Sequence, residues 1–366
     1  FLNGNQNTNS APNENFAREL LELYTIGKGP LAGPGDYTFY TEQDVVEMAK
    51  ILTGWKDTGH NSSNPEVEVD SIFLPEKHDT SVKTLSHRFN QVQIPDLGAS
   101  EYSHLIDIIF EQPEVARFIC RKLYRWFVYY KIDDITESQV IEPMAQILID
   151  NDYVIEPALR ALLSSDHFFN VLNIGPLIKN PIDFVVMLLN QFEVTIPSDN
   201  LELQYAIWHQ QFNKTKQMDM EYYQPPNVAG WKAYYQEPLY YRNWINASTL
   251  PDMMDYTEKM AGNGFIINGY RIRIKPLPLI NSFDNPHDPN EVIHQLSKLL
   301  FPNEITESQK TALKEVLLPG LPDFEWTIEY GNYAADPQNE ELAEAIENKL
   351  KELIKTMLIM PEYYLS

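Results

Sequence analysis

Three stretches of the sequence carry side chains whose types and spacing could support chemistry. The first lies near the N-terminus, where amide, guanidinium and carboxylate groups recur every three or four residues at Asn15, Arg18, Glu19 and Glu22. On a helix these intervals form one face, with the Cβ atoms of Glu19 and Glu22 about 5–6 Å apart. Two carboxylates at that distance can share a cation or change each other's pKa. The alternative is a ladder of ion pairs, because Arg18 lies four residues from both Glu14 and Glu22.

The second stretch is the dipeptide His78-Asp79, which lies with Lys83 and His87 in residues 56–98, a long segment without clear periodicity. Long irregular segments in compact domains are often functional, and a histidine beside an aspartate can act as a base or a ligand. Two histidines nine residues apart are not a metal signature, so the spacing predicts no metal ligand. The cofactor is left open, with a divalent metal as one candidate. The alternative is that His78 and Asp79 only bond to loop backbone.

The third stretch is rich in aromatic residues and contains prolines. It runs from Tyr222 to Trp244 and includes the sequence Pro-Pro-Asn-Val-Ala-Gly-Trp that ends at Trp231. Exposed aromatic rings provide contact area at low entropic cost, which suits sugar or peptide ligands. In this interpretation Asn227, Trp231 and Arg242 are candidate binding residues. In the other interpretation the prolines and glycine lock a buried loop whose rings fill a core.

Apolar residues predict the helices that would position these groups. An apolar stripe at helical spacing accompanies the polar face of the first stretch, at Phe16, Leu20, Leu23 and Tyr24. So short a helix is unstable alone, so its apolar face must dock on another element. The sequence from Thr41 to Asp44 resembles a capping box that opens a second helix, and we expect the two helices to form a pair.

Further helices are expected along the rest of the chain. They lie near residues 100–111, 113–130, 137–150, 155–165, 176–193, 199–212, 243–261, 306–318 and 338–359. The turn Asn268-Gly269 between two short apolar runs predicts a hairpin, and Asp288-Pro289 predicts a helix start. We therefore predict a mostly α fold with one minor β-hairpin near 264–275, organised as a helical core domain (1–260) and a C-terminal extension (261–366).

Composition excludes several classes of protein. The formal net charge is -24, which disfavours nucleic acids and anionic membrane surfaces as partners. A hydrophobic content of 43% excludes wholesale disorder. The single cysteine, Cys120, excludes an intrachain disulfide and a cluster of thiolate metal ligands. No apolar run reaches the roughly 18 residues that a transmembrane helix needs.

Six blocks of the sequence, taken in order, carry a family resemblance. They are residues 13–23, Tyr40 to Trp55, His78-Asp79 with Lys83, 113–123, 179–181 and 225–231. Together, over roughly residues 10 to 250, they resemble the bacterial family DUF1800, in the form found in Bacteroidetes-type bacteria. The family is one of unknown function, so the resemblance implies no mechanism.

The resemblance does imply a location and a partner. Family members are usually longer at the N-terminus, so we expect this chain to begin inside the domain. They often carry export signals, which implies a periplasmic, cell-surface or secreted location. They are often encoded beside exported proteins similar to sulfatases and phosphatases, which implies such a partner and a shared extracellular polymer. Since the family blocks coincide with all three candidate stretches, the stretches are expected to converge.

These observations lead to two competing predictions, and whether the protein is an enzyme stays open between them. The first is an exported protein that binds or processes a carbohydrate or another extracellular polymer. Its hydrolytic or metal-assisted site would use Glu19, Glu22, His78 and Asp79, and its binding residues would be Asn15, Arg18, Asn227, Trp231 and Arg242. The second is a non-catalytic scaffold or partner protein, in which the charges around Arg18 form a structural network and the motifs specify the fold.

Overall fold

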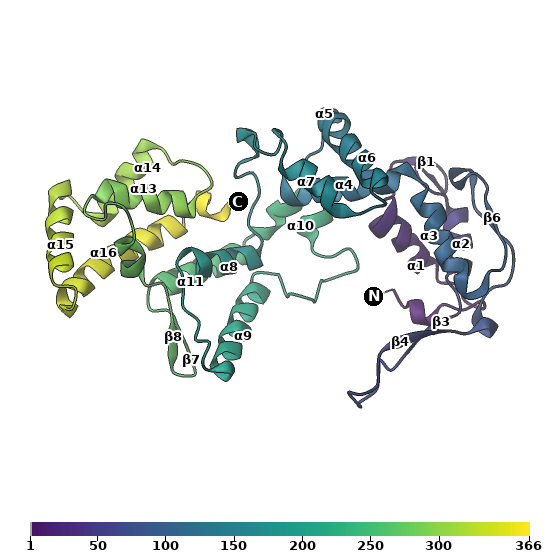
Figure 1. Cartoon of the computed structure of the whole chain (residues 1–366), viewed down its shortest axis with the longest axis horizontal. Coiled ribbons are helices and arrows are strands. Elements are labelled where there is room, and N and C mark those ends of the chain that lie inside the picture. The colour runs from purple at the N-terminus through teal and green to yellow at the C-terminus, as the bar shows by residue number, and fades with distance from the viewer. Residues whose placement is uncertain (1) are drawn as a thin grey trace. The chain divides into compact units, whose positions relative to one another are not determined.

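The computed structural model describes residues 2–366, which divide into two compact units (Figure 1). Unit 1 comprises the described residues up to 168 together with 227–229, and unit 2 comprises residues 169–226 and 230–366. Both units are mostly helical, and their strands form only two-stranded antiparallel sheets, which confirms the predicted fold class. The division at residue 260 stays a prediction. The hydrophobic core of unit 2 contains residues from both sides of that position, from Phe184 to Tyr364.

The helices of unit 1 pack around two hydrophobic clusters. The α-helices are α1 (Glu14–Glu19), α2 (Glu42–Ile51), α3 (Glu101–Phe110), α4 (Pro113–Phe127), α5 (Asp134–Thr136), α6 (Glu142–Asp150) and α7 (Ile155–Leu163). One cluster joins α1, α2 and α3 through buried side chains such as Ala17, Met48 and Leu105. The other joins α4, α6 and α7, and it contains Cys120, which is fully buried as expected for an inert thiol.

The start of α2 matches its sequence signal. The Thr41 hydroxyl accepts a hydrogen bond from the Asp44 amide, and the Asp44 carboxylate accepts one from the Thr41 amide at 2.7 Å. This reciprocal arrangement is the predicted capping box. The first two helices also pack against each other, so the predicted pair is confirmed.

The N-terminal helix buries a face that differs from the predicted one. After α1 the chain continues as a π-helix, η2 (Leu20–Thr25), in which each turn holds more residues than an α-helix. Ala17 in α1 is fully buried. The wider turn rotates the side chains of η2, so Leu21 is fully buried while Tyr24 is 53% exposed. The predicted apolar stripe is therefore wrong at its C-terminal end, because its spacing assumed a regular α-helix.

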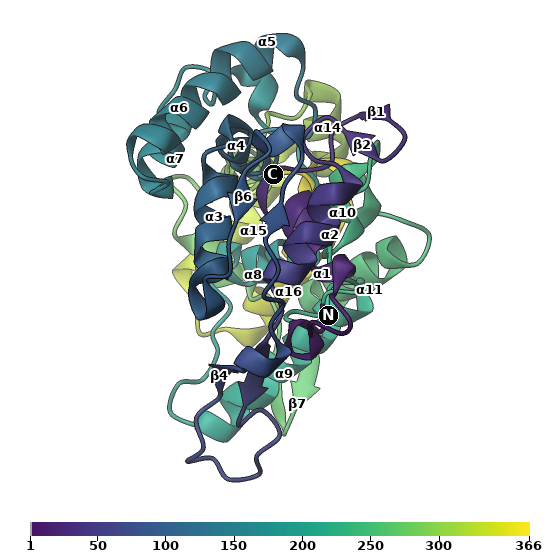
Figure 2. The same cartoon turned by 90° about the vertical axis from the view of Figure 1, so that its right-hand side faces the viewer.

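Residues 56–98, predicted to be irregular, contain short strands. The hairpin of β3 (Trp55–Thr58) and β4 (Asp70–Phe73) extends away from α1, α2 and α3 (Figures 1 and 2), and β5 (Lys83–Thr84) pairs with β6 (Gln93–Ile94). A further pair, β1 (Leu31–Gly33) with β2 (Asp36–Tyr37), precedes α2. Strands of two to four residues are too short to show an alternating pattern, which is why the sequence did not reveal them.

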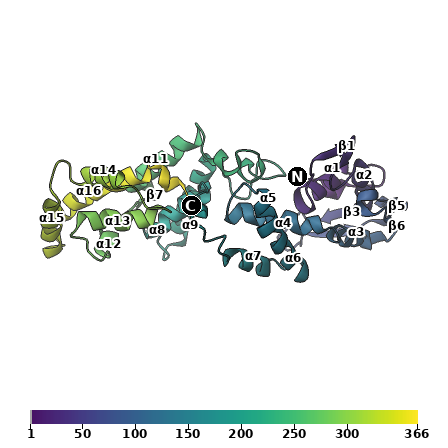
Figure 3. The same cartoon turned by 90° about the horizontal axis from the view of Figure 1, so that it is seen from above.

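Unit 2 is built from helices and one hairpin. Its α-helices are α8 (Pro181–Gln191), α9 (Leu201–Gln217), α10 (Lys232–Tyr235), α11 (Thr249–Ala261), α12 (Pro276–Asn281), α13 (Pro289–Leu300), α14 (Glu307–Leu317), α15 (Asp323–Ala335) and α16 (Glu340–Leu358). Helices α14 and α16 pack side by side, and α16 also contacts α11, α12 and α15 (Figures 1 and 3). The sequence analysis missed α10, α12 and α15.

The hairpin and one helix start of unit 2 follow their sequence signals. Strands β7 (Phe265–Ile267) and β8 (Tyr270–Ile272) pair through a turn in which both Asn268 and Gly269 have positive φ angles, as a type I′ turn requires. The Asp288 side chain accepts a hydrogen bond from the Asn290 amide and caps α13, with a proline at the first helical position. Both predictions are confirmed.

No helix within residues 2–366 has both the length and the apolar character that crossing a membrane requires.

Candidate functional site

The charged groups of the first candidate stretch connect α1 to α2. Arg18 forms a two-point ion pair with Glu42, with Nη1–Oε1 and Nη2–Oε2 distances of 2.8 and 2.6 Å. This hydrogen bonding raises the pKa of Arg18 and lowers the pKa of Glu42. The expected ladder of Arg18 with Glu14 and Glu22 is therefore replaced by a contact between helices. Asn15 lies on the exposed side of α1.

The two carboxylates of this stretch differ in their surroundings. Glu22 accepts a hydrogen bond from the hydroxyl of Tyr40 and lies 3.7 Å from the ammonium of Lys28. Glu19 has no hydrogen bond or ion pair within the described part of the chain. Partial burial raises the pKa of Glu19, and the negative charge of Glu22 raises it further. Glu19 therefore holds a proton more readily than an ordinary glutamate does.

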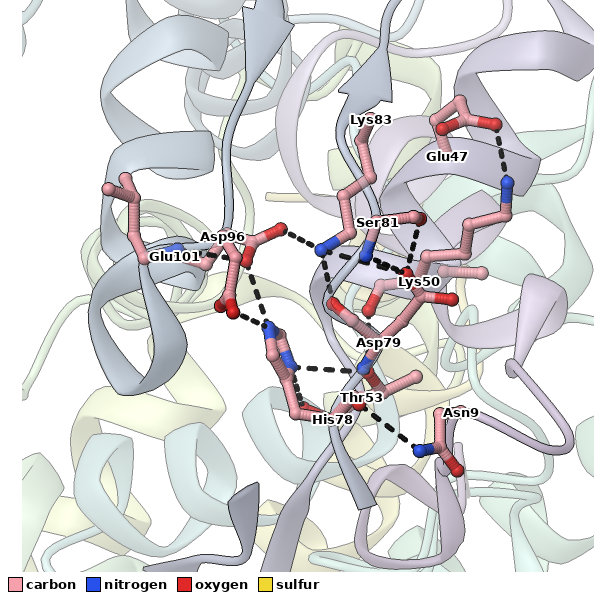
Figure 4. Close-up of polar contacts among 12 residues, drawn as sticks. Asn9, Glu47, Lys50, Thr53, His78, Asp79, Ser81, Lys83, Asp96 and Glu101 are labelled. Atoms are coloured by element: carbon pink, nitrogen blue, oxygen red, sulfur yellow. Dashed lines mark hydrogen bonds and ion pairs between the residues drawn. The ribbon is translucent and has the colours of Figure 1, made fainter. Parts of the chain in front are cut away.

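His78 lies at the centre of the second candidate group (Figure 4). It follows η3 (Pro75–Lys77), and its side chain turns inward until only 3% of the residue is exposed. Gly54 makes room for the His78 side chain, because a Cβ at position 54 would lie 3.1 Å from the Cβ of His78. The φ of Gly54, +94°, is also one that glycine adopts easily. The ring nitrogens Nδ1 and Nε2 lie 3.0 Å from the carbonyl oxygen of Thr53 and 2.9 Å from Oε2 of Glu101.

Lys83 completes a buried row of polar side chains with Glu101 and His78. Its Nζ lies 2.5 Å from Oε1 of Glu101 and also donates a hydrogen bond to the backbone carbonyl of Asp79. Lys83 and Glu101 are both fully buried. Removing either partner would leave a buried charge, which costs several kcal/mol, so the row ties β5, the loop around His78 and the start of α3 together.

The carboxylate of Asp79 faces away from the imidazole that precedes it. Its Oδ1 accepts a hydrogen bond from the Ser81 amide at 2.9 Å and another from the Ser81 hydroxyl. Burial alone would raise the pKa of Asp79, but these hydrogen bonds and the charge of Lys83 outweigh it and hold the pKa below its ordinary value. Asp79 is therefore an ionised group that orders its own loop.

The acidic partners of His78 were not among the predicted site residues. Glu101 is the first residue of α3, and Asp96, whose Oδ1 lies 3.8 Å from Nε2 of His78, belongs to the loop after β6. An acidic residue in the first turn of a helix is common because it complements the helix dipole, so Glu101 carries no special signal. Glu101 lies 23 residues from His78 in the sequence, so no short-range motif links the two residues.

The aromatic stretch divides between interior and surface. Met220, Ala233 and Trp244 form a small core, against which the half-buried Trp231 and Tyr234 pack. The rings of Tyr222 and Tyr223 lie outside this core, 49% and 80% exposed. Part of this stretch thus fills a core, and the ligand-binding role of the rest stays a prediction.

The predicted site residues form separate groups. Glu19 and Glu22 belong to one, and His78 and Asp79 to another, and no hydrogen bond or ion pair of residues 2–366 joins the two. Asn227, whose Oδ1 accepts a hydrogen bond from the Ala229 amide at 2.9 Å, is counted with unit 1, whereas Trp231 and the exposed Arg242 belong to unit 2. Whether all of them serve one site remains a prediction.

Comparison with known proteins places the chain in a family. No curated protein and no solved structure matches it significantly. The family model described as "Protein of unknown function (DUF1800)" matches residues 1–365, and so extends beyond the blocks between residues 10 and 250 that carried the resemblance. The chain therefore belongs to the DUF1800 family.

Proposed function

We propose that this protein is an exported binding protein for a neutral carbohydrate polymer, and that unit 2 holds the polymer through the exposed rings of Tyr222 and Tyr223. The observation that carries the proposal is the position of this pair. Their ring centroids lie 4.1 Å apart, and both rings are presented to solvent on the loop between α9 and α10. Stacked or tilted aromatic pairs offer sugars an apolar face flanked by hydroxyl groups.

The backbone and the small core beneath support such a surface. Tyr223 has a φ of +63°, a conformation that a bulky residue adopts only when its surroundings require it. The loop then runs to Trp231 and Tyr234, whose rings pack on the core with Trp244. A loop anchored in this way loses little entropy on binding, which favours affinity.

Charge narrows the class of polymer. A protein with a net charge of -24 repels sulfated and uronic-acid polymers, so neutral glycans are the better ligands. The location would be periplasmic or at the cell surface.

Affinity electrophoresis through gels that contain neutral or acidic polysaccharides tests this proposal. Neutral glycans should retard the wild-type protein, and the double variant Tyr222→Ala/Tyr223→Ala should lose the retardation. Phe324→Ala removes an aromatic ring of similar exposure (57%) from α15 and serves as the control. Equal retardation of the double variant and the wild type, or no retardation in any neutral gel, would exclude the proposed surface.

A second candidate function is hydrolysis of the glycan in unit 1, because the raised pKa of Glu19 beside Glu22 fits a general acid paired with a carboxylate. His78 and Asp79 would support this site only if the two groups act together. Release of reducing ends by the wild type and its loss in Glu19→Gln, with Glu14→Gln unchanged as the control, would support hydrolysis. Binding without any release of reducing ends would favour the non-catalytic alternative.

A further inference from the structure

The contacts of His78 restrict the position of its protons. Nδ1 lies 3.0 Å from the carbonyl oxygen of Thr53, which can only accept a hydrogen bond. The Thr53 hydroxyl, 3.2 Å from Nδ1, already donates to the carbonyl of Lys50 at 2.6 Å and accepts from the Asp79 amide at 2.9 Å. Nδ1 must therefore carry a hydrogen and donate it to Thr53. A backbone carbonyl that holds Nδ1–H in this way is the usual second partner of a metal-binding histidine.

The other nitrogen, Nε2, faces two carboxylates. Oε2 of Glu101 lies 2.9 Å away and Oδ1 of Asp96 lies 3.8 Å away, and all three atoms lie within 4.8 Å of one another. In the neutral imidazole with Nδ1 protonated, Nε2 is a bare acceptor. An acceptor nitrogen and a carboxylate oxygen at 2.9 Å repel each other unless a positive centre lies between them. That centre is either a proton or a metal ion.

The charges of this region favour a divalent ion. Asp79, Asp96 and Glu101 offer three carboxylates, whereas Lys83 supplies one ammonium near them. The nearby Lys50 is already paired with Glu47 at 2.7 Å. Three negative charges and one positive charge give a net charge of minus two, which one divalent cation would balance. A single additional proton would balance only one of them.

We propose that His78 Nε2, Glu101 Oε2 and Asp96 Oδ1 form a binding site for a divalent transition-metal ion. Two ligand atoms about 2.1 Å from an ion lie about 3.0 Å apart at a right angle and about 3.4 Å apart at the tetrahedral angle. The observed distances from Nε2 are 2.9 Å to Glu101 and 3.8 Å to Asp96, so Asp96 must move closer to bind the ion. Its side chain is 43% exposed, and its Oδ1 accepts one hydrogen bond, from the Gly98 amide at 3.0 Å. One imidazole and two carboxylates suit ions of intermediate hardness such as Zn²⁺ or Mn²⁺.

The arrangement is that of an open site. Lys83 occupies Oε1 of Glu101, so this carboxylate offers the ion one oxygen, Oε2. Three protein ligands, one of them at the surface, leave a coordination position for water or a substrate oxygen, as in catalytic zinc sites. The site lies wholly within unit 1, and it is independent of the glycan surface proposed for unit 2.

Isothermal titration of the full chain with ZnCl₂ and with MnCl₂, after removal of metal by dialysis, tests the site. At least one ion should bind with one-to-one stoichiometry, and Asp96→Asn should weaken that binding by at least about tenfold. Asp96 suits the test because it is exposed and its replacement leaves the buried row of Lys83, Glu101 and His78 intact. Asp70→Asn, an exposed acid on β4, is the matched control and should bind as the wild type does.

Two results would overturn the proposal. One is a dissociation constant weaker than about 1 mM for both ions, because exposed carboxylates alone reach that range. The other is a loss of less than tenfold in Asp96→Asn, since the ion would then lie elsewhere. His78→Asn, which keeps a polar group but removes the imidazole, gives a second test when circular dichroism shows a native fold, and it should abolish one-to-one binding.

Discussion

The buried Lys179 should make the stability of unit 2 depend on pH in the alkaline range. Lys179 is 2% exposed, and its Nζ lies 2.5 Å from the carbonyl oxygen of Tyr363 and 4.2 Å from the centre of the Tyr363 ring. Burial lowers the pKa of Lys179 from 10.5 to about 8, although the charge of Asp183 partly opposes this effect. The folded protein therefore releases a proton from this group more readily than the unfolded chain does.

The direction and size of the effect follow from that pKa. Between pH 8 and 10.5 the unfolded state binds more protons than the folded state, so the free energy of unfolding rises with pH. This contribution of Lys179 to the free energy of unfolding is fully present above pH 10.5 and is lost as the pH falls toward 8. The difference between 10.5 and about 8 corresponds to about 3 kcal/mol, most of which develops between pH 7 and pH 10.

Urea unfolding of wild type and Lys179→Met at pH 7, 8, 9 and 10, followed by fluorescence, measures this dependence. The variant loses the hydrogen bond to Tyr363, which shifts its stability by the same amount at every pH. The free energy of unfolding of the wild type should therefore gain about 2–3 kcal/mol relative to that of Lys179→Met between pH 7 and pH 10. Lys298→Met, an exposed lysine on α13, is the control and should run parallel to the wild type. Parallel curves for Lys179→Met and the wild type would refute the reasoning.

Three smaller predictions concern unit 1 and the hairpin, each measured as a change in unfolding free energy. Arg18→Ala removes a partly exposed ion pair with Glu42 and should cost about 1 kcal/mol or less. Asp44→Ala removes a fully buried carboxylate that accepts four hydrogen bonds and should cost about 3 kcal/mol or more. In Gly269→Ala the added Cβ has no atom within 4 Å, so the variant should lose about 1 kcal/mol because of the positive φ alone. Gly54→Ala should lose more, because its added Cβ would also lie 2.9 Å from the Phe73 ring.

The features that the sequence predicted correctly are those encoded within a few residues. The capping box from Thr41 to Asp44 and the turn at Asn268-Gly269 each need only neighbouring residues, because their hydrogen bonds and φ angles are local. The mostly α fold follows in the same way from apolar residues that recur at helical spacing. Such local signals do not depend on contacts with distant parts of the chain.

The wrong expectations arose where tertiary contacts decide the local conformation. The π-helix after Glu19 rotates Tyr24 to the surface, although the spacing placed it with the buried residues. Arg18 pairs with Glu42 on another helix, although two acids lie one turn away on its own helix. An ion pair between helices can form two parallel hydrogen bonds, which is stronger than a pair along one exposed helix face.

The candidate site shows the same limit. His78 and Lys83 could be found from the sequence, since they lie close together in an irregular segment. Their common partner, Glu101, could not be found, because the pairing of β5 with β6 is what returns the chain to His78 before α3 begins. Asp79, which adjacency made the natural partner of His78, bonds to Ser81 instead. The chemistry of this region therefore depends on a carboxylate that the fold supplies, and a search for further sites in this family should begin from the pair His78 and Glu101 rather than from His78 and Asp79.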